Sequence, residues 1–327
     1  MLTAIVIAFS LKNDPTWYHA CSTDIYQAIS YFTMLGAKVH LFTNLHKFER
    51  IRDVSNLVTK SLVDQSIYNF TFPESTYHVD SFLLLFEELS KLEINGKCMI
   101  YYTGHGTLET IKFPAGDEIS LVDFRKLLFI PFKKTSDIVI ITDCCNPNGL
   151  YLPMILKGKR FRLQNIDRII PEKHNVFLIA SARRDSVSLS SSDGSIFSRY
   201  FFSAVRSFVR GDPVCEVSLH GLKQYVDRSI EEIGREFLFL NESSIETSQT
   251  LTYYASYMIP SIFPLFMLGI PDISFDPHRQ IFIWNSSEKL EYHFDEKERK
   301  ILPKYTENTS IEISPLAKFL LKSRMKE

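Results

Sequence analysis

Two short segments of the sequence carry residue types that could form a catalytic pair. The run YYTGHG at 101–106 has strand character and ends at His105 between two glycines, and VIITDCC at 139–145 ends at Asp143 and two adjacent cysteines. In an open parallel sheet, reactive groups lie beyond the carboxyl ends of the strands. If these two strands are neighbours, an imidazole lies beside a thiol, and that pair can generate a thiolate nucleophile. The sequence therefore predicts a cysteine hydrolase.

Such an enzyme also needs backbone donors for the negative oxygen that develops on the attacked carbonyl. Gly106 can supply one N–H group, because glycine tolerates close approach to a bound carbonyl. The N–H of the nucleophilic cysteine would be the second donor. A single histidine or cysteine is more often a core residue, but the two together at strand ends favour catalysis. From this pattern alone, either Cys144 or Cys145 can be the nucleophile.

Composition excludes several function classes. The chain has 327 residues, 45% of them hydrophobic, so it can bury a large core in one long domain or two. A net charge of −1 gives no reason to expect binding to nucleic acid or to an anionic membrane. The five cysteines form no disulfide framework and predict free thiols in a reducing compartment, hence a cytoplasmic protein; they are residues 21, 98, 144, 145 and 215.

Membrane and metal signals are weak. The apolar stretch at 251–270 has nearly spanning length, but Pro260 and Pro264 interrupt it, so we expect core strand plus loop. The apolar start of the chain predicts a buried first strand, not a signal peptide. No C-x-x-C pair or His/Cys spacing suggests zinc. We expect no metal and no cofactor.

Strand-like and helix-like runs alternate along the chain. Strands are predicted at 2–9, 37–43, 97–103, 137–143, 175–181 and 264–269, and helices at 21–35, 76–92, 120–130, 196–210 and 216–238. A small hairpin is expected around 111–113, and the serine-rich stretch at 186–195 is predicted to be a mobile surface loop. This order predicts an α/β fold with a mostly parallel sheet and helices on both faces. Residues 1–270 are expected to form the main domain, and 271–327, which change in character, a C-terminal extension or small subdomain.

The GHG and D-C-C motifs, each at a strand end, resemble those of the caspase–metacaspase superfamily of cysteine peptidases over roughly residues 1–270. The resemblance implies a three-layer sandwich around a six-stranded, mostly parallel sheet. In metacaspases the nucleophile motif is typically D-x-C-H-S-G. Aligning Asp143-Cys144-Cys145 with D-x-C implies that Cys145 is the nucleophile and His105 the catalytic histidine, with Gly106 and Cys145 supplying the oxyanion donors.

A third motif makes the metacaspase branch the closer one. Cys21 and Asp24 have the Cys-to-Asp spacing of a G-C-x-N-D-like motif at the start of the first helix in that branch. The resemblance implies that Asp24 and Asp143 shape an acidic pocket for Arg or Lys, with Cys21 and Thr103 at the same pocket. Two carboxylates would indeed favour a guanidinium or ammonium group. The alternative for Asp24 is a solvated residue of the first helical turn, favoured by the helix dipole.

The sequence also departs from the metacaspase pattern. Asn146-Pro147-Asn148-Gly149 follows the nucleophile where the family has His-Ser-Gly, which could alter oxyanion geometry or access of the leaving group. Many metacaspases bind calcium through acidic residues. The equivalent stretches here offer only Asp117, Glu118 and Asp123, whereas calcium takes six to eight oxygen ligands. We therefore expect a calcium-independent protein.

The preferred hypothesis is a metacaspase-like cysteine endopeptidase (a thiol protease) that cleaves protein or peptide substrates after Arg or Lys. Cleavage of its own chain at the basic run 157–160 is a secondary hypothesis. One alternative is a catalytically impaired caspase-like scaffold, with 271–327 as the arm that docks a protein partner. Another is a different cysteine hydrolase, such as an amidase or transferase, which fits the His–Cys pair but not the Cys21/Asp24 motif.

Overall fold

The structure is a computed structural model. It describes residues 2–11, 15–45, 73–145, 148–157, 160–163, 173–183, 188–191, 194–210, 213–215, 219–241 and 249–256, together with four strands after residue 272. The predicted strand at 264–269 and any helix within 46–72 lie outside the described residues.

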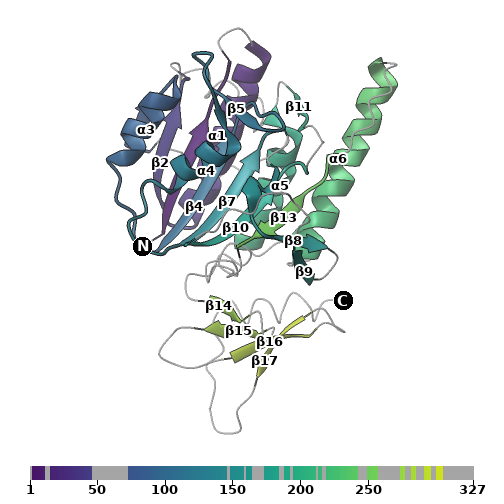
Figure 1. The fold of residues 1–327 in the computed structure, drawn as a ribbon. Coiled ribbons are helices and arrows are strands. Elements are labelled where there is room, and N and C mark those ends of the chain that lie inside the picture. Colours follow the sequence, from purple (N-terminus) through teal and green to yellow (C-terminus); the bar gives the residue numbers. More distant parts are fainter. Residues whose placement is uncertain are drawn as a thin grey trace.

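A nine-stranded sheet forms the centre of the molecule (Figure 1). Its strand order is β3-β2-β1-β4-β7-β10-β13-β8-β9. The strands from β3 to β10 in this order are parallel, and β13, β8 and β9 pair antiparallel. The bounds are β1 Thr3–Ala8, β2 Lys38–Thr43, β3 Ser75–His78, β4 Lys97–Thr103, β7 Asp137–Asp143, β8 Met154–Lys157, β9 Arg160–Leu163, β10 Asn175–Ala180 and β13 Thr252–Ala255.

The predicted α/β sheet is confirmed, and five of its expected strands are β1, β2, β4, β7 and β10. The sixth core position is taken by β13, which lies inside the 251–270 stretch that was expected to contribute strand and loop. Three further strands extend the expected sheet: β3 at one edge, and β8 with β9 at the other.

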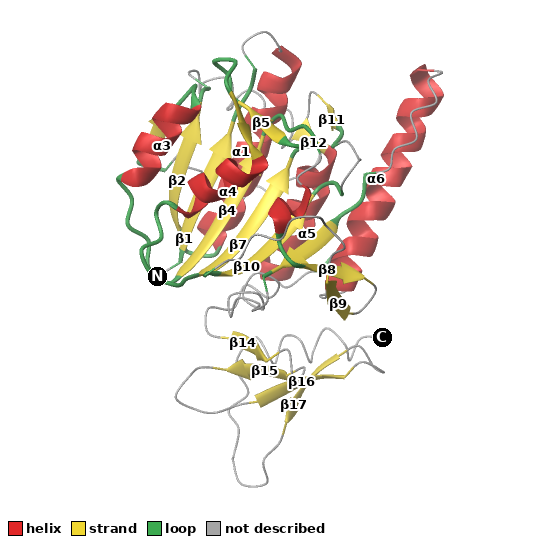
Figure 2. Cartoon of the chain, viewed as in Figure 1, coloured by secondary structure: helices red, strands yellow, loops and turns green. Residues whose placement is uncertain are grey.

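Helices cover both faces of the sheet (Figure 2). Side chains of α1 (Pro15–Met34), α5 (Ile196–Arg210) and α6 (Leu219–Asn241) share one apolar core with the sheet, and those of α3 (Phe82–Ser90) and α4 (Leu121–Phe129) share the other. The cause is the two-residue period of a strand, which sends successive side chains to opposite faces. In β4, for example, Met99 and Tyr101 face the α1 side, whereas Ile100 and Tyr102 face the α4 side.

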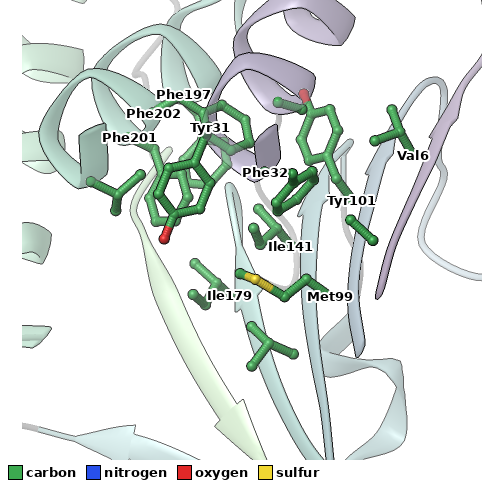
Figure 3. Packing of buried hydrophobic residues seen from close by; sticks show 14 of the residues in the cluster. Val6, Tyr31, Phe32, Met99, Tyr101, Ile141, Ile179, Phe197, Phe201 and Phe202 are labelled. Carbon is green, nitrogen blue, oxygen red and sulfur yellow. The ribbon is translucent and has the colours of Figure 1, made fainter. Parts of the chain in front are cut away.

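Aromatic rings fill the core on the α1 side (Figure 3). Phe202 of α5 packs edge-on against Tyr101 of β4, with ring centroids 5.2 Å apart, and lies 5.9 Å from Tyr31 of α1. All three side chains are buried. Burying one such ring contributes about 1.5–3 kcal/mol, so these contacts fix α1 and α5 on the sheet close to its carboxyl edge.

The predicted helix at 76–92 is only partly correct. Its first residues form β3, and α3 begins at Phe82 after an N-cap at Ser81, whose hydroxyl accepts from the Leu84 N–H at 3.5 Å. β3 forms because it pairs in parallel with β2 and because Tyr77 stacks on Phe42 with centroids 4.6 Å apart. A neighbouring strand thus overrides the local helical spacing.

The other local predictions hold with shifted ends. The first helix begins at Pro15, six residues earlier than expected, and proline is favoured in the first helical turn. The hairpin around 111–113 consists of β5 (Thr110–Lys112) and β6 (Glu118–Ser120). All five cysteines are free thiols, as expected.

In the C-terminal region the described strands form a separate four-stranded antiparallel sheet, in the order β14-β15-β16-β17. Their bounds are β14 Ile273–Asp276, β15 Ile281–Trp284, β16 Glu291–Asp295 and β17 Lys300–Lys304. The domain boundary at residue 270 stays a prediction, because 257–272 lie outside the described residues. None of the helices that the structure describes is long and apolar enough to cross a membrane.

Candidate active site

The two reactive segments follow neighbouring strands at the centre of the sheet. β4 and β7 are parallel, with Thr103 opposite Asp143, and the Gly104 N–H donates to the Asp143 carbonyl at 3.3 Å. His105 and Cys145 each come two residues after this last pair. The expected neighbourhood of the two strands is therefore confirmed, and the site lies at the carboxyl edge where parallel sheets hold their reactive groups.

The loop that carries His105 is fixed from two sides. The His105 carbonyl accepts hydrogen bonds from the Lys112 N–H at 3.1 Å and from the Tyr102 hydroxyl at 3.2 Å. The first of these donors belongs to the β5–β6 hairpin, and Gly106 forms a bridge with Ile111 of the same hairpin. The hairpin thus supports the backbone that follows the histidine, and Tyr102 of β4 adds a second donor to the same carbonyl.

Gly106 packs directly against the cysteine segment. A Cβ atom added to Gly106 would lie 2.6 Å from the Cys145 carbonyl oxygen and 3.4 Å from Cys144 Sγ. Only glycine fits this approach, because real Cβ atoms do not come so close to a backbone oxygen. The residue next to the histidine is therefore in contact with the backbone of Cys145.

The two adjacent cysteines have different environments. Cys144 is buried among apolar residues on the α4 side, and burial raises the pKa of its thiol well above the ordinary value. Cys145 is half-buried, and its Sγ accepts a hydrogen bond from the Ser188 N–H at 3.4 Å. Burial raises the pKa of the Cys145 thiol, the Ser188 N–H lowers it, and the charge of Asp143 raises it. Of the two residues, Cys145 is the one that is partly exposed.

Asp24 lies in the same cluster as the end of β4. One carboxylate oxygen accepts from the Thr103 hydroxyl at 3.0 Å, and the other accepts from the Ser195 N–H at 3.0 Å. The side chain is 1% exposed, so the alternative of a solvated first-turn residue is wrong. Because α1 begins at Pro15, Asp24 lies in the middle of the helix and faces the sheet.

Asp143 is equally buried and is held by serines from two elements. The Ser188 hydroxyl donates to one carboxylate oxygen at 2.7 Å, and the Ser198 hydroxyl of α5 donates to the other. Ser198 is in turn hydrogen-bonded to the Tyr101 hydroxyl at 2.6 Å. Tyr101 projects from β4 toward α1 and α5 (Figure 3), which places this network on the same side of the sheet as Asp24.

The two carboxyl groups affect each other. Burial raises the pKa of Asp24 well above its ordinary value, and the charge of Asp143 raises it further, against hydrogen bonds from Ser195 and Thr103. Burial also raises the pKa of Asp143, although serine hydroxyls oppose the shift. Each described donor to either carboxylate is a neutral hydroxyl or backbone amide. The structure therefore brings together two acidic groups with uncharged partners.

The serine-rich segment is not simply a mobile surface loop, and that prediction is wrong for its described part. Residues Ser190–Ser191 (β11) and Gly194–Ser195 (β12) pair as a short antiparallel ladder, and Ser195 is 1% exposed. Gly194 has φ +106°, and a Cβ there would lie 3.0 Å from an Asp24 carboxylate oxygen. The polar composition was misleading because Ser188 and Ser195 donate hydrogen bonds to buried carboxylates.

Cys21 lies three residues before Asp24 on α1, but its thiol bonds to backbone outside the acidic pair. Sγ donates to the Phe9 carbonyl at 3.2 Å, and the side chain is part of the buried apolar core. Of the four residues expected at the acidic pocket, Asp24, Asp143 and Thr103 are linked by hydrogen bonds or charge. The described hydrogen bond of Cys21 goes to the end of β1 instead.

Several residues near the site were not predicted from the sequence. Besides the serines, Gln249 donates to the Ser188 hydroxyl and accepts from the Leu189 N–H. Buried Arg125 of α4 donates from Nη1 to the carbonyls of Leu150 and Tyr151 at 3.0 and 3.3 Å. Leu150 and Tyr151 have φ +46° and +57°, so Arg125 holds the strained chain that follows the cysteine segment. Local spacing gives no signal for these residues, because their partners lie in other segments of the chain.

The acidic residues considered as calcium ligands interact with other groups of the protein. Asp117 accepts from the Phe82 N–H at 2.8 Å, Glu118 pairs with Lys112 at 3.1 Å, and Asp123 pairs with Lys126 at 2.8 Å. Among the described residues, no group of three or more His, Cys, Asp or Glu side chains could hold a metal ion. These residues do not fit a calcium site, and calcium independence stays a prediction.

Comparison with known proteins gives a likeness of structure only. No family model matches the chain, and no curated protein matches its sequence. Among solved structures, the chain is similar to caspase-1 from Spodoptera frugiperda, with a TM-score of 0.41 and 10% identity over 79% of this chain and 88% of that one.

Proposed function

We propose that the protein is a metacaspase-like cysteine endopeptidase in which His105 and Cys145 form the catalytic pair. The observation that carries the proposal is the contact of Gly106 with the Cys145 backbone, which leaves no space for a Cβ atom. Because His105 is adjacent to this glycine, its backbone lies close to the cysteine segment, and Cys145 is the more exposed of the two adjacent cysteines.

The reaction follows from the roles of these groups. His105 takes the proton from Cys145 Sγ, and the sulfur attacks the peptide carbonyl carbon. The N–H groups of Gly106 and Cys145 stabilise the oxyanion. When the C–N bond breaks, His105 gives its proton to the leaving amine, and water then hydrolyses the thioester to free the acid and the thiol. No metal takes part.

The preference for Arg or Lys on the acyl side of the cut bond is proposed from the acidic pair. Asp24 and Asp143 are buried, repel each other and have only neutral described donors. An incoming guanidinium or ammonium group would relieve this repulsion, whereas an acidic side chain would increase it. The hydroxyls of Thr103 and Ser198 beside the carboxylates can turn to accommodate such a cation.

The test compares fluorogenic peptides that end in Arg, Lys, Ala or Asp, with and without a calcium chelator. We expect turnover of the Arg and Lys peptides that Cys145→Ala and His105→Ala each reduce by at least about 10³-fold, and that the chelator does not change. Cys144→Ala is the matched control and should retain activity. Cleavage of the Asp peptide alone would overturn the specificity, and equal activity of wild type and Cys145→Ala would overturn the catalytic assignment.

A further inference from the structure

Ser188 contacts both functional parts of the site at once. Its backbone N–H donates to Cys145 Sγ at 3.4 Å, and its hydroxyl donates to an Asp143 carboxylate oxygen at 2.7 Å. A single residue therefore joins the reactive sulfur to one of the two carboxylates. Ser188 belongs to neither the proposed catalytic pair nor the acidic pair.

Gln249 holds Ser188 in the position that allows both contacts. Its amide Nε2 donates to the Ser188 hydroxyl at 3.1 Å, and its Oε1 accepts from the Leu189 N–H at 2.9 Å. The Gln249 side chain is 5% exposed. Beyond it, Asp227 of α6 accepts from the Leu251 N–H at 2.7 Å, which fixes this part of the chain to a helix.

The two donor groups of Ser188 serve different neighbours: the hydroxyl bonds to Asp143 and the backbone N–H to Cys145. A hydroxyl has one proton to donate, and here it goes to Asp143 while a lone pair accepts from Gln249. The backbone N–H is then directed at Cys145. An N–H donor stabilises a thiolate and opposes the two effects that disfavour it, burial of the sulfur and the charge of Asp143.

We propose that Ser188 is a positioning residue that couples the acidic pair to the nucleophile. Its hydroxyl, anchored between Asp143 and Gln249, aims its N–H at the Cys145 sulfur. A substrate cation that engages Asp143 therefore acts on a residue that also contacts the nucleophile. The inference rests on the proposed function where it refers to a substrate. The hydrogen bond from the Ser188 N–H to the Cys145 sulfur does not depend on that function.

The test uses the full chain and the variants Ser188→Ala, Ser188→Thr and Ser190→Ala. Ala at 188 keeps the N–H but removes its anchor, Thr keeps both groups, and Ser190→Ala makes the same chemical change two residues away. The first measurement is the rate at which iodoacetamide alkylates Cys145 from pH 6 to 9, followed by peptide mass spectrometry. The second is kcat and KM on an Arg peptide.

We expect Ser188→Ala to slow alkylation at neutral pH about fivefold, the effect of losing one hydrogen bond, and to move the pH profile upward. Ser188→Thr and Ser190→Ala should follow the wild type. Gln249→Ala should act in the same direction as Ser188→Ala, and it serves as the second variant if Ser188→Ala does not fold. With the Arg peptide, kcat/KM should fall about tenfold in Ser188→Ala.

The proposal is overturned if neither Ser188→Ala nor Gln249→Ala changes the alkylation profile of Cys145. This holds even if either variant is less stable, because a merely structural role changes stability alone. The proposed function can fail separately: if the wild type cleaves no peptide, the peptidase assignment is lost, whereas the alkylation profile still decides whether Ser188 positions the thiol.

Discussion

Asp24 of α1 and Asp143 at the end of β7 are two buried carboxyl groups that repel each other. Burial is the larger cause of the raised pKa of Asp24, and the charge of Asp143 is the second. The chain keeps this costly pair at the carboxyl edge of the sheet, and Asp143 directly precedes the two cysteines. Such a concentration of shifted pKa values is typical of functional sites.

Replacing one member of the pair should stabilise the protein. The folded state binds protons to Asp24 more readily than the unfolded state, because its folded pKa is raised. Stability is therefore lost as the pH rises from the ordinary carboxyl pKa of about 3.9 through the raised value. Asp24→Asn removes this loss, so we expect a higher unfolding temperature at pH 7.5, by a few degrees or about 1 kcal/mol, and no difference near pH 4.

Thermal unfolding followed by circular dichroism across this pH range measures the effect. Asp123→Asn is the control, since Asp123 is half-exposed and pairs with Lys126 at 2.8 Å. It should leave stability unchanged or lower it slightly. A loss of stability in Asp24→Asn at pH 7.5 would contradict the repulsion.

Asp143→Asn should make the nucleophile more reactive while it weakens recognition. The charge of Asp143 raises the pKa of the Cys145 thiol, so neutralising it should lower that pKa and speed alkylation of Cys145 at neutral pH. Turnover of Arg peptides should fall by about tenfold or more, because a charge-assisted contact is lost. Alkylation rates and kcat/KM measured on the same preparation separate the two effects. Asp24→Asn should reduce turnover but accelerate alkylation less, since Asp24 is not among the causes of the Cys145 shift.

Gly106→Ala should abolish most activity. Its Cβ would lie 2.6 Å from the Cys145 carbonyl oxygen, so either the His105 loop or the Cys145 backbone must move. A displacement of about 1 Å at the reacting atoms costs about a hundredfold in rate, and kcat/KM on an Arg peptide measures it. Gly96→Ala is the matched control, because Gly96 has φ +92° and open space around it at the opposite end of β4. It should lower stability and leave kcat/KM intact, which separates damage to folding from damage to the site.

Ser198→Ala should move the acid limb of the pH–activity profile upward. The Ser198 hydroxyl lowers the pKa of Asp143 by donating to the carboxylate. Without this donor the pKa of Asp143 rises further. As the pH is lowered, the carboxylate that attracts a cation is then protonated earlier, at a higher pH than in the wild type. The kcat/KM for an Arg peptide between pH 5 and 8 reports this shift. Ser207→Ala on the same helix, whose hydroxyl donates to the Ala204 carbonyl, should leave the profile in place.

The reactive residue types and the strands that carry them could be predicted from the sequence. Runs of apolar, β-branched residues that stop at Gly104 and Asp143 define the ends of β4 and β7 to the residue. These are local properties, and burial on both faces of a parallel sheet demands such runs. The same reasoning identified His105 and the pair of cysteines as candidates.

Tertiary structure alone decided which groups surround them. Ser188 and Ser198 donate to Asp143 from 45 and 55 residues away along the chain, and Gln249 donates to Ser188 from 61 residues away. No local pattern encodes such contacts. The edge strand β3 formed where spacing favoured helix, because a neighbouring strand offered hydrogen bonds. The sheet also decides which of the two cysteines is exposed. Alternation of side chains buries Cys144 on the α4 side, whereas the Cys145 sulfur lies within hydrogen-bond distance of the Ser188 N–H.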